Sequence, residues 1–395
     1  MNKVIQLQKY LFVSLGVFIP TSIAITNFII VLLAICWVLE GDLKSKIKII
    51  KDSKWMLSIF ALIGLYALGM FWGDIHLNAK WQFQRLALLL VFPILATIKI
   101  NQRTIENGVA AFLITNFISA VIAILINNQI ISPLGEIIPL INKSSEVSAF
   151  IKYNYHNVLL ALSVMLCWYL VIENKTRHKY LLLIFIIAYT VSIFTEIGRA
   201  GQVIFNLAAI FYIIYYNSRN LFRGIAFFLL LFSFQFVVYN TTKAYKNRLD
   251  SVSLIIKNNG KREHGGYIGE DIRYVFVRES LTKILEKPFL GHGTGSFGTI
   301  FKDDIYSGHV FNKQTTPHNQ YLYIWFELGI LGLLLLLRIF YYQTLDLLKT
   351  SDGIHKVLLP LSFMFLMLID SYFFIYIVTI AYIYLYTIYN RYQLE

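Results

Sequence analysis

Residues 316–342 read TPHNQYLYIWFELGILGLLLLLRIFYY, a polar turn followed by a long apolar run that contains two charged residues, Glu327 and Arg338. A helix needs about 20 mainly apolar residues to cross the hydrocarbon core of a bilayer. Similar runs recur along most of the 395 residues, and the chain is 57% apolar and 14% charged, with a mean hydropathy of +0.62. Soluble domains carry about 25% charge. The composition therefore excludes a soluble globular protein and predicts a polytopic membrane protein.

Twelve apolar stretches are predicted to be membrane helices, so the expected fold class is all-α with about 12 transmembrane helices. Asp370 and Ser371 interrupt the last apolar run, which favours two short spans over one long helix. The predicted spans are 10–22, 23–39, 55–72, 81–98, 106–127, 153–172, 181–196, 201–216, 224–240, 319–342, 357–371 and 372–389.

The positive charges predict how these helices are oriented. One alternating set of connections carries 17 Lys and Arg residues, whereas the short connections on the opposite side carry four, namely Lys80, Lys143, Lys152 and Arg199. Because short cytoplasmic loops are enriched in Lys and Arg, both termini are expected in the cytoplasm. The chain then divides into residues 1–240 with nine helices, one large outer loop over 241–318, and residues 319–395 with three helices.

The outer loop is basic, against the usual depletion of positive charge on its side of the membrane. Residues 241–317 hold 12 Lys and Arg against eight Asp and Glu, which indicates that the loop holds something anionic. Within it, residues 271–287 are expected to form an amphipathic helix that stops at Pro288. The glycine cluster at residues 291–298 lacks the Lys-Ser or Lys-Thr ending of a phosphate-binding loop.

Arg199 is the first candidate for an anion site. The segment 194–201 (FTEIGRAG) interrupts two apolar runs at the outer face, where an arginine is costly. A guanidinium matches phosphate oxygens with paired hydrogen bonds, and Gly198 and Gly201 would let the backbone approach a ligand closely. The alternative is an arginine that only reaches the lipid headgroups.

Further cations are candidates for the same task. Arg273 and Arg278 lie five residues apart on the predicted loop helix and therefore not on one stripe, so we expect one of them to face the site. The alternative for either is a surface ion pair. Lys80 and Arg85, at the outer start of a span, would neutralise phosphate or reach the headgroups.

His318 is the candidate base. It lies where the outer loop re-enters the membrane, between Pro317 and Asn319. A neutral imidazole at such a boundary is suited to taking a proton from a hydroxyl near neutral pH. Glu327 follows about two and a half helical turns later and is expected to be a structural partner. Tyr155-His156-Asn157, at another outer boundary, is a weaker candidate for binding sugar, and the alternative for the tyrosine is anchoring in the aromatic belt of the membrane.

In three of these segments the chain resembles the O-antigen ligase and polymerase superfamily of bacterial envelope glycosyltransferases, most closely the ligases. His318-Asn319, then nine residues, Gly329, two residues and Gly332, is similar to the family's histidine motif. The run 273–297 is similar to its arginine helix and proline-glycine exit. The segment around Arg199 departs from the pattern, because Gly198 stands where the family usually has serine. The resemblance is specific over about residues 199–332.

This resemblance implies transfer of a glycan from undecaprenyl pyrophosphate to a hydroxyl at the periplasmic face of the inner membrane, without metal, nucleotide or other cofactor. A pyrophosphate is already a good leaving group, so the reaction needs cations for the departing charge and a base for the hydroxyl. The expected base is His318, and the expected cations are Arg199 and Arg273. Secondary candidates are Arg278, Asn319, Lys80 and Arg85.

Several activities share this chemistry, and they differ in the acceptor. A ligase uses a sugar hydroxyl of lipid A-core in lipopolysaccharide biosynthesis, a polymerase joins repeat units, and an oligosaccharyltransferase modifies protein. We favour the ligase, since a compact chain without an added soluble domain speaks against a protein acceptor. A transporter or flippase of lipid-linked glycans is the alternative from another class, but transporters often place charges near the membrane midplane, whereas here they collect at one face.

Overall fold

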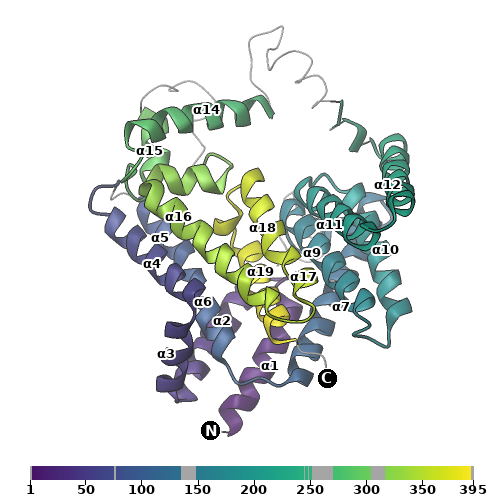
Figure 1. The fold of residues 1–395 in the computed structure, drawn as a ribbon, viewed down its shortest axis with the longest axis horizontal. Helices are drawn as coiled ribbons and strands as arrows, with labels where there is room; N and C mark the ends of the chain where they lie inside the picture. Colours follow the sequence, from purple (N-terminus) through teal and green to yellow (C-terminus); the bar gives the residue numbers. More distant parts are fainter. Residues whose placement is uncertain are drawn as a thin grey trace. The chain divides into compact units, whose positions relative to one another are not determined.

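The computed structural model of this chain describes residues 2–74, 77–134, 148–243, 245–247, 249–250, 270–303 and 316–392. Within these ranges every regular element is helical, as predicted (Figure 1). Much of the predicted outer loop, at 251–269 and 304–315, lies outside the described residues.

The helices follow the predicted apolar stretches. Each of the twelve stretches overlaps a helix, and the last apolar run divides after Ile369, where Asp370 has an extended backbone. The helices are α1 (Asn2–Phe18), α2 (Ile23–Leu39), α3 (Leu43–Asp52), α4 (Lys54–Gly69), α5 (Leu77–Ala87), α6 (Val91–Thr97), α7 (Gln102–Asn127), α9 (Tyr153–Ile172), α10 (Lys179–Thr195), α11 (Ala200–Asn217), α12 (Leu221–Thr241), α14 (Glu270–Glu286), α15 (Ser296–Asp303), α16 (Gln320–Leu348), α17 (Gly353–Lys356), α18 (Leu358–Ile369) and α19 (Tyr376–Arg391), with 3-10 turns at Leu88–Leu90 and Tyr372–Phe374.

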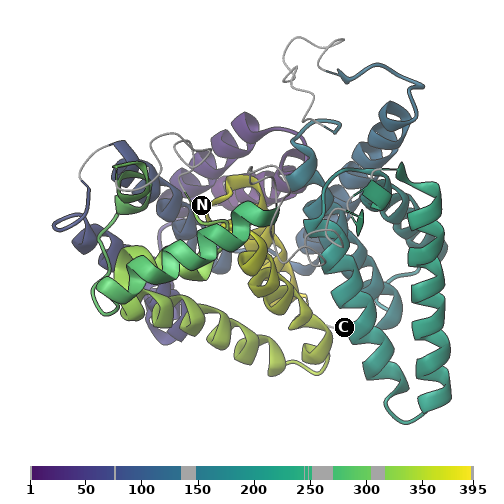
Figure 2. The ribbon, with the colours of Figure 1, turned by 90° about the horizontal axis from the view of Figure 1, so that it is seen from above.

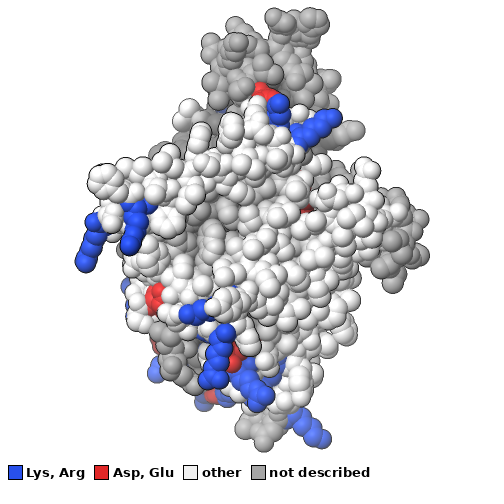
Figure 3. Space-filling view, turned by 90° about the vertical axis from the view of Figure 1, so that its right-hand side faces the viewer, with Lys and Arg blue, Asp and Glu red and all other residues white. Residues whose placement is uncertain are grey.

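Five of the described helices are long and apolar enough to cross a membrane, and a sixth crossing results if the bent pair α2 and α3 is counted as one. The five are α7, α9, α11, α12 and α16. Figure 3 shows one face of the molecule, in which wide areas carry neither acidic nor basic side chains. The protein is therefore an all-helical membrane protein.

The chain forms two compact units. The first unit comprises residues 1–8, 32–99 and 261–390, and the second comprises residues 9–31, 100–260 and 391–395. The candidate base, His318, belongs to the first unit, and Arg199 belongs to the second.

Aromatic side chains fill the core of the first unit. Residues 377–389 of α19 are all buried, and their rings contact the neighbouring helices. Tyr382 stacks on Phe363 of α18 with ring centroids 4.2 Å apart, and Tyr386 meets Trp55 of α4 at 5.4 Å. Such pairs add about 0.5–1.5 kcal/mol each beyond the area that they bury. These contacts pack α19 against α18 and α4, next to the break between α18 and α19 that contains Asp370.

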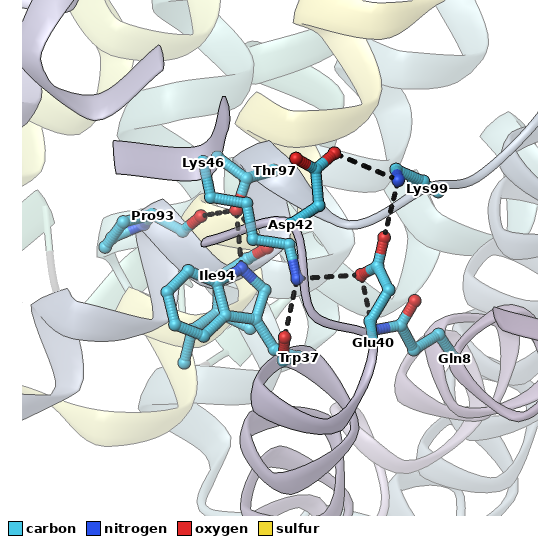
Figure 4. A network of polar contacts seen from close by, with 9 residues as sticks. All are labelled: Gln8, Trp37, Glu40, Asp42, Lys46, Pro93, Ile94, Thr97 and Lys99. Carbon is cyan, nitrogen blue, oxygen red and sulfur yellow. Dashed lines mark hydrogen bonds and ion pairs between the residues drawn. The ribbon is translucent and has the colours of Figure 1, made fainter. Parts of the chain in front are cut away.

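A buried ion pair fixes the junction of α2 and α3 (Figure 4). Nζ of Lys46 lies 2.9 Å from the carboxylate of Glu40, and both side chains are almost fully buried. Gln8 donates to the same carboxylate at 3.1 Å, and Lys99 bridges Glu40 and Asp42 at 3.5 and 3.2 Å. Breaking a buried pair leaves an uncompensated charge, so this network defines the direction in which α3 leaves α2.

The second unit is built around α9, which packs against α7, α10 and α11. Fourteen of its 20 residues are buried, which makes it the central helix of the unit. α11 and α12 run side by side (Figure 2), and Gln235 of α12 donates to Asn206 of α11 at 2.8 Å.

Candidate active site

His318 pairs with Asp370 in the first unit. Nδ1 of His318 lies 3.0 Å from Oδ1 of Asp370, and the two side chains are 29% and 28% exposed. The pair is therefore accessible to a ligand. In the sequence Asp370 stands out only as a helix break, because 52 residues separate it from His318, so its role as a partner was not predicted.

Local backbone geometry holds both members of the pair. His318 has a φ of 50°, a left-handed conformation that residues other than glycine adopt rarely and that is often found at functional sites. Asn319 is the N-cap of α16, and its side-chain oxygen accepts from two backbone N–H groups of the first turn, at 3.0 and 3.1 Å. The N–H of Ser371 donates to Oδ1 of Asp370 at 2.7 Å. The positions of the imidazole and the carboxylate are thus fixed by the chain around them.

The pairing assigns the protons of the imidazole. An ionised carboxylate only accepts hydrogen bonds, so Nδ1 of His318 carries the proton that is donated to Asp370. In the neutral ring Nε2 is then the basic nitrogen. A carboxylate in this position orients the ring and stabilises the imidazolium that forms when Nε2 takes up a proton. The pair is therefore suited to general base catalysis.

The predicted loop helix is present as α14, and it packs against α16 (Figure 1). The ring centroid of Phe276 in α14 is 5.6 Å from that of His318. Arg273 precedes Phe276 by three residues, and its side chain is outside the described part of the chain. Arg278 is exposed and pairs with Glu279 at 2.6 Å. α14 therefore meets His318 at Phe276, whereas Arg278 forms a surface ion pair, and the role of Arg273 stays a prediction.

Lys80 and Arg85 both belong to α5 in the first unit. This helix contacts the turn Tyr372–Phe374, which begins two residues after Asp370. Arg85 lies in the last turn of α5 and is half-buried, whereas the side chain of Lys80 is outside the described part of the chain. α5 therefore approaches the segment that carries Asp370.

The glycine cluster after α14 fastens the loop to the membrane helices. Gly291, Gly293 and Gly295 all have positive φ angles, which favour glycine. N–H groups of this segment donate to backbone carbonyls of α4 and α16: His292 to Phe326, Gly293 to Glu327, and Thr294 to Gly69, at 2.8, 2.8 and 3.0 Å. The cluster thus holds the end of α14 against the helix that begins after His318.

Glu327 completes this attachment from within α16. Its Oε1 accepts from the N–H of Gly295 at 2.9 Å. Two residues later α16 is kinked at Gly329, which has a φ of 66° and where a Cβ atom would lie 2.0 Å from the carbonyl oxygen of Phe289. Glu327 therefore supports the loop attachment, the structural role that its spacing from His318 suggested.

Arg199 is the N-cap residue of α11 in the second unit, and the N–H of Val203 donates to its carbonyl at 3.0 Å. The first N–H groups of a helix and its dipole favour an anion at this end. The N-terminus of α11 therefore contributes positive potential at the residue that carries this arginine.

Gly198 and Gly201, beside Arg199, allow close helix packing. The prediction was instead that they allow the backbone to approach a ligand. A Cβ atom on Gly201 would lie 2.1 Å from the carbonyl oxygen of Asn157, and one on Gly198 would lie 2.7 Å from its Cβ. The turn between α10 and α11 thus lies directly on α9, and only glycine fits at that distance.

A buried polar cluster in the second unit also involves this turn. Nδ1 of His156 lies 2.8 Å from Oε1 of Glu196, its Nε2 lies 2.8 Å from Oγ of Ser119, and Ser192 donates to Glu196 at 2.7 Å. His156 is completely buried, which contradicts the expectation that it binds sugar. The cluster joins α7, α9 and α10 immediately before Arg199, and its spread over three helices kept it from being predicted.

Comparison with known proteins identifies the family of this region. No curated protein matches the chain. The family model described as O-antigen ligase matches residues 184–337, a range that includes Arg199, α14, the glycine cluster and His318. Residues 184–337 are therefore similar to the O-antigen ligase family.

Proposed function

We propose that this protein is an O-antigen ligase that transfers a glycan from undecaprenyl pyrophosphate to a sugar hydroxyl of lipid A-core. The observation that carries the proposal is the accessible His318–Asp370 pair at the start of α16, with Nδ1 and Oδ1 3.0 Å apart. A base oriented by a carboxylate is what a hydroxyl acceptor requires.

In the proposed reaction the acceptor oxygen attacks the anomeric carbon of the donor sugar. Nε2 of His318 takes the hydroxyl proton while the bond between the sugar and the pyrophosphate breaks. Arg199 and Arg273 bind the pyrophosphate and stabilise the charge that it gains. The products are a glycosidic bond, undecaprenyl pyrophosphate and an imidazolium that returns its proton to solvent. The chain's own residues supply base and cations, so no metal, nucleotide or other cofactor is needed.

The remaining candidates take secondary roles in this proposal. Asn319 positions His318 by capping α16, and Arg85, Lys80 and Arg278 add positive charge near the donor. The site is proposed to face the periplasm from the inner membrane. Twelve spans would place both termini in the cytoplasm, with residues 1–240 and 319–395 in the membrane and residues 241–318 as the outer loop.

A transfer assay tests the proposal. Purified protein in detergent, with chelator, receives donor glycan on undecaprenyl pyrophosphate together with lipid A-core. The ligase predicts glycosylated lipid A-core from wild type and a large loss with His318→Ala. Elongated lipid-linked glycan formed without acceptor would instead identify a polymerase, and glycan on protein would identify an oligosaccharyltransferase. No covalent product, combined with donor movement across a vesicle membrane, would identify a flippase and contradict the enzyme.

A further inference from the structure

The helix α3 is short, basic and sharply bent away from α2. The axes of the two helices differ by 112°, so α3 runs close to perpendicular to the apolar helix before it. Ten residues of helix extend about 15 Å, which is half of a hydrocarbon core about 30 Å thick. With four lysines in those ten residues, α3 is too short and too basic to cross the membrane by itself.

The exposed surface of α3 carries an apolar stripe next to a basic stripe, and a further exposed apolar residue, Ile49, lies on the other side of the helix. Leu43 and Ile47 lie four residues apart on one stripe, and their side chains are 42% and 46% exposed. Lys44 and Lys48 form the neighbouring stripe. Lys51 lies between the apolar stripe and the basic stripe, and all three lysines are exposed. Exposed apolar side chains bordered by lysines are typical of helices that lie in the membrane interface.

The buried ion pair fixes which side of α3 faces outward. Lys46, the fourth lysine, is 2% exposed and bound to Glu40 at 2.9 Å. Its Nζ also donates to the carbonyl of Trp37 at 2.5 Å and lies 4.8 Å from the ring centroid of the same residue (Figure 4). Because Glu40 neutralises Lys46, the positive charge that α3 presents outward comes from Lys44, Lys48 and Lys51, against one exposed carboxylate, Asp52.

We propose that α3 is an interfacial helix that binds anionic phospholipid, with Leu43 and Ile47 among the upper acyl carbons and Lys44, Lys48 and Lys51 on the phosphates. Charge complementarity selects this occupant, since clusters of lysine next to a membrane helix attract anionic headgroups. The Lys46–Glu40 pair fixes the orientation of α3 so that both stripes face the lipid. This surface is separate from the proposed transfer reaction and does not depend on it.

Fluorescence quenching in lipid nanodiscs tests the proposal on the full chain. A bimane label is placed on Ile47→Cys or, as the matched control, on Ser45→Cys, which lies on the opposite side of the same helix from Leu43 and Ile47. The unsubstituted chain measures background labelling of the buried Cys36 and Cys167. Brominated acyl chains are expected to quench the label at position 47 about threefold or more above the label at position 45, and iodide in the water is expected to do the reverse.

The lipid preference is measured with the same mole fraction of brominated lipid, supplied either as phosphatidylglycerol or as phosphatidylcholine. Each lysine near an anionic surface changes binding by about fivefold, so phosphatidylglycerol should quench position 47 more strongly. The variant Lys44→Gln/Lys48→Gln/Lys51→Gln, whose substitutions are all at exposed positions, should lose this preference and keep its stability. Iodide quenching at position 47 without lipid quenching would overturn the proposal. So would quenching by neither agent, which would mean that a second copy covers the helix, or a preference that survives the triple substitution.

Discussion

The pairs His318–Asp370 and His156–Glu196 have the same chemistry in different surroundings. Their nitrogen–oxygen distances are 3.0 and 2.8 Å, yet the first pair is 29% and 28% exposed and the second is 0% and 2% exposed. His318 also has a left-handed backbone, whereas His156 lies in the regular helix α9. A histidine beside a carboxylate is thus a candidate base only where a substrate can reach it. A buried pair of this kind holds helices together.

Replacing His318 should give the largest functional effect. We expect His318→Ala to reduce glycan transfer about 10²–10⁴-fold, the usual contribution of a general base. The free energy of unfolding should change by no more than about 0.5 kcal/mol, because the site is partly exposed. Initial rates and denaturant unfolding in detergent measure the two quantities, with the exposed His178→Ala as control. Full activity in His318→Ala would remove the distinction between the two pairs.

Replacing His156 should have the opposite profile. His156→Ala leaves the carboxylate of Glu196 buried without its histidine partner, so the free energy of unfolding should fall by about 3–5 kcal/mol. Denaturant unfolding in detergent measures this loss. The matched control is Ser163→Ala, which removes a buried hydrogen bond within the same helix, to the carbonyl of Leu159, and should cost about 1 kcal/mol. Unchanged stability with lost transfer would show that His156 is catalytic.

Asp370→Asn tests whether the carboxylate orients the base. The amide is similar in size but no longer stabilises an imidazolium, so we expect the turnover rate to fall about 10²-fold while the KM for the donor stays the same. Steady-state kinetics at saturating acceptor separates these terms. An increase in donor KM at an unchanged turnover rate would instead make Asp370 part of the donor site.

A glycine substitution probes the close packing beside Arg199. Gly201→Ala places a Cβ atom 2.1 Å from a backbone oxygen of α9, and overpacking of this kind costs about 1–3 kcal/mol. Gly224→Ala is the control, because its nearest neighbour is 3.5 Å away and alanine favours a helix. Thermal unfolding of both variants is compared. Equal melting temperatures would contradict the packed turn.

The smallest effect concerns a third histidine, His292, whose Nε2 donates to the carbonyl of Lys283 at 2.8 Å. Burial lowers the pKa of His292 below its ordinary value of 6.5, partly offset by this hydrogen bond. As the pH falls below about 6.5, the unfolded chain therefore binds a proton before the folded chain does, and stability decreases. Unfolding measured between pH 7.5 and pH 5.5 should show a steeper decline for wild type than for His292→Gln. Parallel curves would show that His292 is not titrating in this way.

The helical fold class was predictable because each apolar stretch can be recognised from consecutive residues, whereas five or six of the described helices, not twelve, are long and apolar enough to span a membrane. α9 begins and ends at the predicted residues, and α14 is within one residue of its predicted bounds at each end. The bend into α3 was not predicted, since it depends on the pair formed by Lys46 with Glu40 and on tertiary packing.

The candidate residues can be picked out from the sequence, whereas their partners cannot, and the roles of the candidates stay predictions. His318, Arg199 and Arg273 stand out as polar residues beside apolar runs. Asp370 does not stand out, because its hydrogen-bond partner, His318, is 52 positions away in the sequence. Gly198 and Gly201 indicate that another group approaches the backbone closely, but the sequence does not show which group. We expected a ligand. In the structure that group is Asn157.

Donor binding without acceptor separates the two proposed roles, namely that cations hold the pyrophosphate and that His318 takes the proton. Binding of the undecaprenyl-pyrophosphate donor is measured for wild type, Arg199→Ala and His318→Ala in detergent. A charge-assisted hydrogen bond contributes about 1.5–3 kcal/mol, so Arg199→Ala should bind the donor at least about tenfold more weakly. His318→Ala should bind it as wild type does, although it has lost transfer. Weakened binding in His318→Ala together with unchanged binding in Arg199→Ala would contradict this division of roles.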